Sequence, residues 1–421
     1  MSLIRHNDNN LPEASGRALV PYQEKAVALL KEVGLPSRRD ETWRPSQKMA
    51  LLSEEELPLA EKFYLDSVQK SFLSDFDSYK IIFINGYYAE NLSDPLPEGV
   101  SFSSLAQAVQ DRDASLGLID GISAPYDQGY KHLNSVMCRD GAILNVAKDT
   151  IIDKPIHLVF KNISEKTVTY GRVLIQVESN AKVQFMAEHI TTASQHENHV
   201  AECYIGAGAQ VSYIKIAADM KDAAHIGSFS ADIARDATFN LGFYGFGSNF
   251  CRTETNIYLS GQGANANFGA ANYISQTDMN EHISTFIHNV PHCNSSQLFQ
   301  SLCDDRGRSV VQSKTIVARD AQKTDGHQML RALLLSDKAN AFAKPELEIY
   351  ADDVKCAHGS AVGQLDADAI FYLRARSIPL SEAKALLTRA FMSEALSVID
   401  NEELSERLIA HFSDTLLEDF A

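Results

Sequence analysis

A weak internal repeat in the middle of the chain constrains its fold more than any other feature. A small turn residue, an alanine and then alternating apolar positions recur four times, at Asn180–Val183, Gly208–Val211, Asp236–Phe239 and Asn265–Phe268. The alanine-to-alanine spacings are 28, 28 and 29 residues, and short alternating strands such as Val173–Val177 lie between them. A period of this size without intervening helices predicts a parallel β-helix, because one coil cannot bury its apolar face alone. The alternative, a β-sandwich, would show turns roughly every 8–12 residues without the longer period.

The first hundred residues are expected to be largely helical, with one strand near their end. Apolar residues at helical spacing predict a helix from Pro21 to Val33, and Gly34 is a natural stop. Residues 81–84 then predict a buried strand, followed by a turn at Asn85-Gly86. Trp43, after a charged cluster, is expected to anchor a solvated turn to the core.

The end of the chain is expected to be helical again. Asp366 is a suitable cap for a short helix that Pro379 ends, and Ser381 is predicted to cap a second helix. A third helix is expected after Asn401. These helices either cap the last coil or offer a docking handle to a partner. The predicted division is a helical N-terminal domain (1–100), a β-helix core (101–364) and a helical C-terminal domain (365–421).

The charge balance excludes several classes of partner. The 421 residues include 38 basic and 55 acidic side chains, a net charge of −17. This charge repels phosphate backbones and anionic lipid surfaces, so neither nucleic-acid nor membrane binding is expected. The polar start lacks the apolar core of a signal peptide, and no apolar run approaches about 20 residues, so we expect a cytoplasmic location. The six scattered cysteines are then expected to be reduced and mainly structural: Cys138, Cys203, Cys251, Cys293, Cys303 and Cys356.

Common enzyme signatures are absent from the sequence. It holds no phosphate-binding loop, no serine-hydrolase elbow and no zinc-protease helix motif. Asp352 and Asp353 could act as a carboxylate pair, but a turn is the favoured interpretation because aspartate bonds its own backbone there. The histidines of the last third lack compact zinc-site spacing, at His282, His288, His292, His327 and His358.

Cys356 and His358 form the strongest candidate pair. Two residues apart on a predicted strand, they face the same side, about 6.6 Å apart along the chain. A thiolate and an imidazole are ligands for iron, copper or zinc. Two ligands do not close a site, so a working site here needs further groups from elsewhere.

The surroundings of this pair resemble a known family. The similar segments are Ala321–Gln328, Leu333–Ser336, Lys344–Gly359, Gly363–Asp366 and Phe371–Arg376, with weaker agreement at Gly34–Trp43. Together they resemble the SufB/SufD family of the SUF iron–sulfur cluster assembly machinery. The Lys355–Gly359 motif favours the D-type subunit, because the B-type subunit usually carries a Glu-His-Glu-Ala-like segment there. The chain departs from the pattern at Ala357, at 376–378 and at 311–314, which concerns coil geometry and helix docking rather than the cysteine–histidine pair.

The resemblance implies a right-handed parallel β-helix between two helical domains and a scaffold rather than an enzyme. It implies pairing with the paralogue SufB through the β-helix and binding of the ATPase SufC through the C-terminal helices, 366–421. His358, with Cys356 second, would be the metal half-site of a transient iron–sulfur cluster shared with SufB, without a permanently bound cofactor. A reduced flavin in the complex and a homodimer of the isolated chain stay open. The rival hypothesis is a stand-alone β-helix enzyme acting on polysaccharide, which needs carboxylates or basic residues along one groove.

Overall fold

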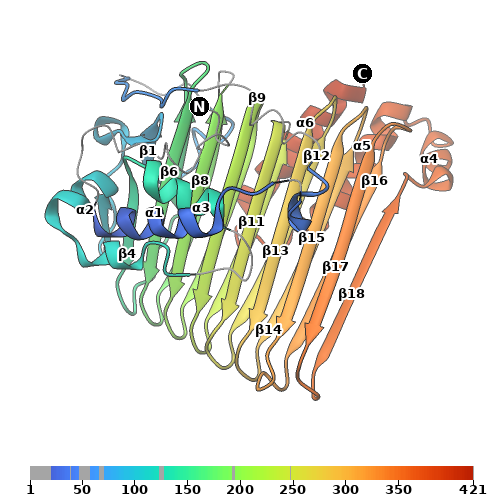
Figure 1. Cartoon of the computed structure of the whole chain (residues 1–421). Helices are drawn as coiled ribbons and strands as arrows, with labels where there is room; N and C mark the ends of the chain where they lie inside the picture. The colour runs from blue at the N-terminus through green and yellow to red at the C-terminus, as the bar shows by residue number, and fades with distance from the viewer. Residues whose placement is uncertain are drawn as a thin grey trace.

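The chain forms a solenoid of two parallel β-sheets in the computed structural model (Figure 1), which describes residues 20–420 except 38, 47–56, 66–70, 123–127, 192–194 and 247. One sheet, sheet A, consists of β4 (Gly141–Val146), β6 (Val168–Val177), β8 (His196–Ile205), the second half of β9 (Gln210–Ile233), β11 (Ser248–Leu259), β13 (Met279–His288), β15 (Arg308–Val317) and β17 (Asn340–Ile349).

Sheet B lies behind sheet A in Figure 1. It consists of β1 (Tyr79–Ile84), β5 (Ile156–Asn162), β7 (Lys182–Thr191), the first half of β9, β10 (Thr238–Phe246), β12 (Asn265–Ile274), β14 (Asn294–Cys303), β16 (Asp325–Leu334) and β18 (Lys355–Gly363). Two short strands pair antiparallel at the start, β2 (Tyr87–Tyr88) with β1 and β3 (Val100–Ser104) with β4. The chain descends in sheet A and rises in sheet B as the coils advance, so the predicted right-handed parallel β-helix is confirmed.

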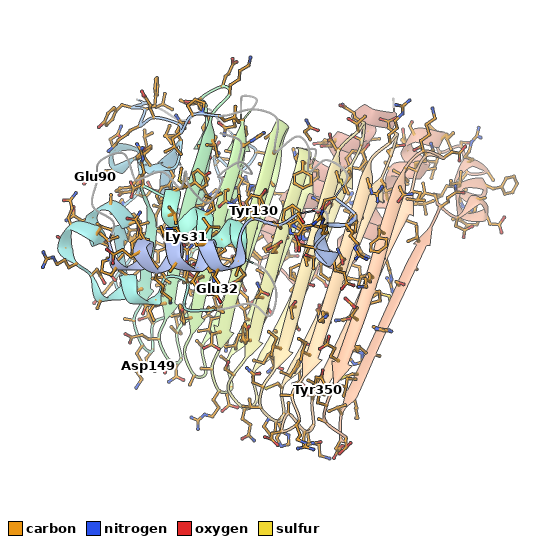
Figure 2. The ribbon with its side chains drawn as sticks, viewed as in Figure 1. Lys31, Glu32, Glu90, Tyr130, Asp149 and Tyr350 are labelled. Atoms are coloured by element: carbon orange, nitrogen blue, oxygen red, sulfur yellow. The ribbon has the colours of Figure 1, made fainter. Side chains whose placement is uncertain are left out.

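One row of corners explains the sequence repeat. In each coil between Asn180 and Lys323, one residue has a left-handed backbone conformation, with φ between 57° and 78°, and a small buried residue follows it. Those residues are Asn180, Gly208, Asp236, Gly263, His292 and Lys323. Figure 2 labels Asp149 and Tyr350 at the two ends of this lower edge. The left-handed residue turns the chain sharply, and a small side chain fits inside the corner.

The fourth predicted repeat is wrong by two residues. Thr238 pairs with Asn265, so Ala237 is followed one coil later by Ala264 and not by Ala266. Both alanines are buried and point to the same side of the chain. The pattern alone could not choose between them, and the left-handed turn at Gly263 decides the register.

The solenoid interior is an apolar core of stacked side chains. Phe83, Phe160 and Phe185 lie in neighbouring coils of sheet B and are almost fully buried. Phe83 and Phe160 stack with ring centroids 5.0 Å apart. Stacking of this kind lets each coil bury its neighbour's inner face.

The N-terminal helices cover the outer face of sheet A. Helix α1 (Pro21–Val33) has the predicted bounds, and Gly34 ends it with a φ of 72°. It packs on α3 (Gly129–Met137), whose Asn134 Nδ2 donates to the carbonyl of Gly171 in β6 at 3.0 Å. The remaining helices here are α2 (Leu105–Asp111) and the 3₁₀ turns Glu41–Trp43, Glu90–Leu92 and Ala114–Leu118.

Two local predictions for this part are confirmed. Trp43 is buried, with the Arg252 guanidinium 3.7 Å from its ring centroid. Strand β1 ends at a turn with positive φ at Asn85 and Gly86. Because β1 pairs in parallel with β5, the first solenoid strand comes from before residue 101. The division at residues 100 and 364 stays a prediction.

The C-terminal helices are α4 (Ala367–Arg374), α5 (Leu380–Leu396) and α6 (Glu402–Phe420). Helices α5 and α6 pack on the outer face of sheet B, behind the solenoid in Figure 1, and α4 contacts α5. Asp366 caps α4, and Asn401 Oδ1 accepts from the Leu404 N–H at 3.0 Å, as predicted. The prediction for Ser381 is wrong, because α5 already begins at Leu380 after Pro379.

These helices do not cap the last coil. Phe412 of α6 lies with its ring centroid 3.9 Å from that of Phe246 in β10, and the Gln300 side chain in β14 accepts from the Ala395 N–H at 2.9 Å. Both contacts are to earlier coils, so α5 and α6 leave β17 and β18 uncovered at the right-hand end of Figure 1. Apolar residues of sheet B's outer face, such as Ile214 and Tyr244, determine this position.

Candidate functional site

The last coil is the open end of the solenoid. Strand β17 pairs with β15, and β18 pairs with β16, and no other described strand pairs with either. Each strand therefore presents one edge of unpaired backbone donors and acceptors. Apolar side chains on this coil are exposed as well, including Phe342, Ile349, Tyr350 and Val362.

Cys356 and His358 lie on β18 and face the interior side of the solenoid. The ladder places Cys356 beside Gly326 and His358 beside Gln328. Gly326 and Gln328 are buried in β16, whereas Cys356 is half-buried and His358 is exposed. No further coil follows β18. The positions of Cys356 and His358, which are buried in the earlier coils, are therefore open to solvent here. Both side chains are thus accessible at the open end of the solenoid.

The Cys356 thiol is not activated by its own chain. Burial raises its pKa, and the backbone of Gly326 only partly opposes that effect. Raised pKa favours the protonated thiol at neutral pH, and the thiolate is the form that binds metals.

The other predicted residues have structural positions. Asp352 and Asp353 form an exposed bend, and Asp353 is ion-paired with Lys323, so the turn interpretation is confirmed. His282 and His288 are buried, and His327 is exposed beside Asp325. Five of the six cysteines are buried and none forms a disulfide, as expected.

A second exposed surface lies on α4 and the start of α5. Phe371 is 75% exposed and Tyr372 is 55% exposed, although both are large and apolar. Leu380 and Leu386 extend this surface along α5. Within α5, Leu386 is exposed, whereas Ala385, Thr388 and Met392 are buried.

Sequence reasoning missed a buried polar cluster inside the solenoid. His189 in β7, Glu197 in β8 and His225 in β9 meet at the upper corner between the sheets. Burial alone would raise the pKa of Glu197, but His189 and His225 hold it well below its usual range. Burial lowers the pKa of Lys215, whose Nζ lies 2.6 Å from His225 Nε2. The available signal was the run His196-Glu197-Asn198-His199, because charged residues at alternating positions of a buried strand are unusual.

Comparison with known proteins identifies the family. The family model described as the SUF system FeS cluster assembly SufBD core domain matches residues 160–391, and that of the SufBD protein N-terminal region matches residues 1–158. The chain belongs to the SufBD family. Its membership confirms the resemblance that rested on the Lys355–Gly359 motif and its surroundings.

Curated relatives cover nearly the whole chain. An iron–sulfur cluster assembly SufBD family protein of Synechocystis is 29% identical over 413 residues, which are 93% of this chain and 89% of the relative. The iron–sulfur cluster assembly protein SufD of Escherichia coli is 27% identical over 416 residues, 97% of this chain and 96% of that protein. SufD of Bacillus subtilis is 24% identical over 322 residues, 74% and 73% of the two chains. This SufBD protein therefore resembles D-type relatives along its length. In its described part, no helix is long and apolar enough to cross a membrane.

Proposed function

We propose that this SufBD protein is a scaffold subunit that supplies one half of an iron–sulfur assembly site, with His358 and Cys356 as its metal-facing residues. The observation that carries the proposal is their place on an interior-facing strand at the open end of the solenoid. The cluster is cargo, and a site with two ligands from each side can release it. Four ligands from one chain would hold it more firmly.

The partner at this end is proposed to be the B-type paralogue, SufB. A second solenoid of the same architecture can continue the ladders of β17 and β18 and cover the exposed apolar residues of the last coil. Its side chains would then face Cys356 and His358 across the junction. A second copy of this chain offers the same edge, which makes a homodimer the competing arrangement.

The proposed partner of the C-terminal helices is the ATPase SufC. The exposed surface of Phe371, Tyr372, Leu380 and Leu386 is apolar and lies on α4 and α5, and α5 contacts sheet B. Exposed apolar patches of this kind mark protein interaction sites. Movement of the helices on ATP binding would then reach the shared site through the sheet.

The test of the half-site is His358→Ala in the chain co-expressed with its B-type and ATPase partners. We expect the complex to assemble as in the wild type, because His358 is exposed and makes no packing contribution, while iron–sulfur cluster formation falls at least tenfold. Cluster formation is followed by visible absorbance after anaerobic addition of iron and sulfide. Cys356→Ser is expected to reduce it as well.

The matched control is His327→Ala. His327 is exposed one strand away, beside Ala357 in the ladder, and points to the outer face. Full cluster formation by His358→Ala would remove His358 from the site. Equal loss by His327→Ala would show that the effect is not specific to the interior-facing pair.

Nothing in the described structure favours a polysaccharide-cleaving enzyme. Its candidate carboxylates, Asp352 and Asp353, lie in an exposed bend, and Asp353 is already paired with Lys323.

A further inference from the structure

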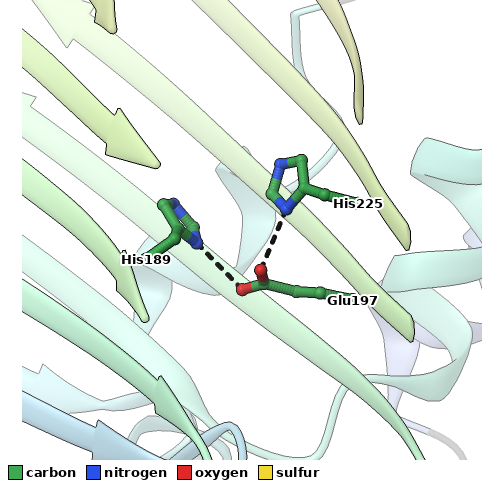
Figure 3. A group of neighbouring side chains, drawn as sticks. All are labelled: His189, Glu197 and His225. Atoms are coloured by element: carbon green, nitrogen blue, oxygen red, sulfur yellow. Dashed lines mark hydrogen bonds and ion pairs between the residues drawn. The ribbon is translucent and has the colours of Figure 1, made fainter. Parts of the chain in front are cut away.

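Three ionisable side chains converge inside the solenoid, several coils away from the open end (Figure 3). Glu197 receives two imidazoles, with its Oε1 2.9 Å from His189 Nδ1 and its Oε2 2.9 Å from His225 Nδ1. All three side chains are at most 3% exposed. They come from three consecutive strands, so this geometry exists only in the stacked coils.

The surrounding backbone leaves room for these rings. His199 pairs with Gly171 on one side and Gly227 on the other in the ladder of sheet A. A Cβ at Gly171 would lie 2.6 Å from the His199 ring, and one at Gly227 would lie 2.8 Å from His225 Nε2 and 2.9 Å from Lys215 Nζ. Glycine weakens a strand, so its presence at both positions indicates a space reserved for close approach.

Two imidazole nitrogens of the cluster lack partners. Nε2 of His189 and Nε2 of His199 are buried without a hydrogen-bond partner among the described residues. The two rings lie edge to face with centroids 4.7 Å apart. Buried polar atoms are nearly always paired, so both nitrogens have unmet hydrogen-bonding capacity in this part of the solenoid.

We propose that His189, Glu197 and His225 bind a first-row divalent cation of the zinc or ferrous iron class. One ligand atom from each residue can be chosen so that all three lie within 4.8 Å of one another, and each imidazole Nδ1 lies 2.9 Å from one of the two Glu197 oxygens. Metal–ligand bonds of about 2.0–2.1 Å place tetrahedral ligands about 3.3 Å apart, so small shifts of the rings suffice. Two histidines and one carboxylate form a donor set found in zinc and non-haem iron sites.

Neighbouring groups suit this role. Lys215 Nζ lies 2.6 Å from Nε2 of His225 and so helps to hold the ring with its Nδ1 toward Glu197. His199 or a water can complete the coordination. The site is separate from the Cys356/His358 pair: six strand-to-strand steps of about 4.8 Å in sheet B, roughly 29 Å, lie between β7 and β18.

The test is metal binding by the purified full-length chain, stripped with chelator and then titrated with Zn²⁺ alone, Co²⁺ alone and, without oxygen, Fe²⁺ alone. We expect one equivalent of metal per chain, and a Co²⁺ spectrum with visible ligand-field bands but without a thiolate charge-transfer band. His189→Asn and His225→Asn are expected to weaken binding about 100-fold. His288→Asn is the matched control, since His288 is also buried but lies at the end of β13 beside Ser295, and it should bind as the wild type does.

The outcomes separate clearly. Failure of the folded wild-type chain to retain a metal would overturn the proposal, as would unchanged affinity in His189→Asn and His225→Asn. A thiolate band in the Co²⁺ spectrum of the wild type would place the metal on a cysteine instead, which also refutes it. That spectrum needs no variant, so the test stands even where a substituted chain does not fold. Cys356→Ser should leave this metal equivalent in place.

Discussion

At the scale of single residues, the solenoid holds buried ionisable side chains that are kept uncharged or paired. Arg172 is buried against Asp120 and Glu202, with its Nη2 2.7 Å from Asp120 Oδ1. Burial alone would raise the pKa of Asp120, but Arg172 and His132 outweigh it and hold the pKa well below its usual range. His282 has no such charge partner and is kept neutral. Because the pKa values of these groups differ between the folded and unfolded chain, the free energy of unfolding depends on pH.

His282 provides a pH-dependent prediction. Burial, with a smaller effect of Lys215, lowers its pKa from 6.5 to about 3. Between these values the unfolded chain binds a proton that the folded chain excludes, so the free energy of unfolding falls as the pH drops below about 6.5. At pH 5 this proton uptake lowers the free energy of unfolding by about 2 kcal/mol, at about 1.36 kcal/mol for each pH unit below 6.5.

The measurement is denaturant unfolding at pH 7 and pH 5. His282→Asn keeps a polar group for Asn272, whose Nδ2 lies 3.1 Å from His282 Nε2. Between pH 7 and pH 5, the free energy of unfolding of the variant is expected to fall by about 2 kcal/mol less than that of the wild type. Equal losses in both chains would show that His282 does not carry the dependence.

At the scale of elements, the C-terminal helices have two different faces. Leu404, Leu408, Phe412 and Leu416 of α6 are fully buried on or near sheet B. The exposed residues of α4 and α5 make no comparable contact. One face therefore stabilises the fold, and the other is available to a partner.

Leu386 and Phe412 test these faces separately. Leu386→Asp should change the free energy of unfolding by no more than about 0.5 kcal/mol, because the side chain is 48% exposed, and it should abolish binding of the ATPase partner. Phe412→Ala should lower the free energy of unfolding by about 3–5 kcal/mol, because it leaves a cavity against Phe246. Chemical denaturation gives the stabilities, and co-purification of the ATPase gives the binding. ATPase binding retained by Leu386→Asp would exclude this surface.

At the scale of the whole molecule, the solenoid is closed at one end and open at the other. The antiparallel strands β2 and β3 lie at its start, together with the N-terminal helices. The last coil has no such cover among the described residues. An uncovered sheet edge with exposed apolar side chains is prone to association, which fits the partner proposed for this end.

The open end yields a prediction about assembly. Phe342→Asp and Val362→Asp place charges on the last coil, where the native side chains are 40% and 47% exposed. The isolated chain should keep its thermal midpoint within a few degrees, while the complex with the B-type paralogue is lost because a charge would be buried without a partner. Sedimentation of the mixed subunits measures this. An intact complex would place the paralogue on another surface, and loss of only a homodimer would identify a second copy as the occupant.

The sequence by itself determined the features that depend on local pattern. The 28-residue period predicted the solenoid, the bounds of α1 followed from helical spacing and Gly34, and Asp366 and Asn401 marked the starts of α4 and α6. The Cys356/His358 pair was visible because its two members are close in the chain.

Only the tertiary structure decided which residues from different coils meet. The choice between Ala264 and Ala266 required the register, and the docking of α5 and α6 on sheet B, away from the last coil, required the packing of their faces. The cluster of His189, Glu197 and His225 brings together residues up to 36 positions apart in the chain. The physical reason is common to all three: contacts between coils depend on side-chain volume and corner geometry, which a residue pattern along one strand does not contain.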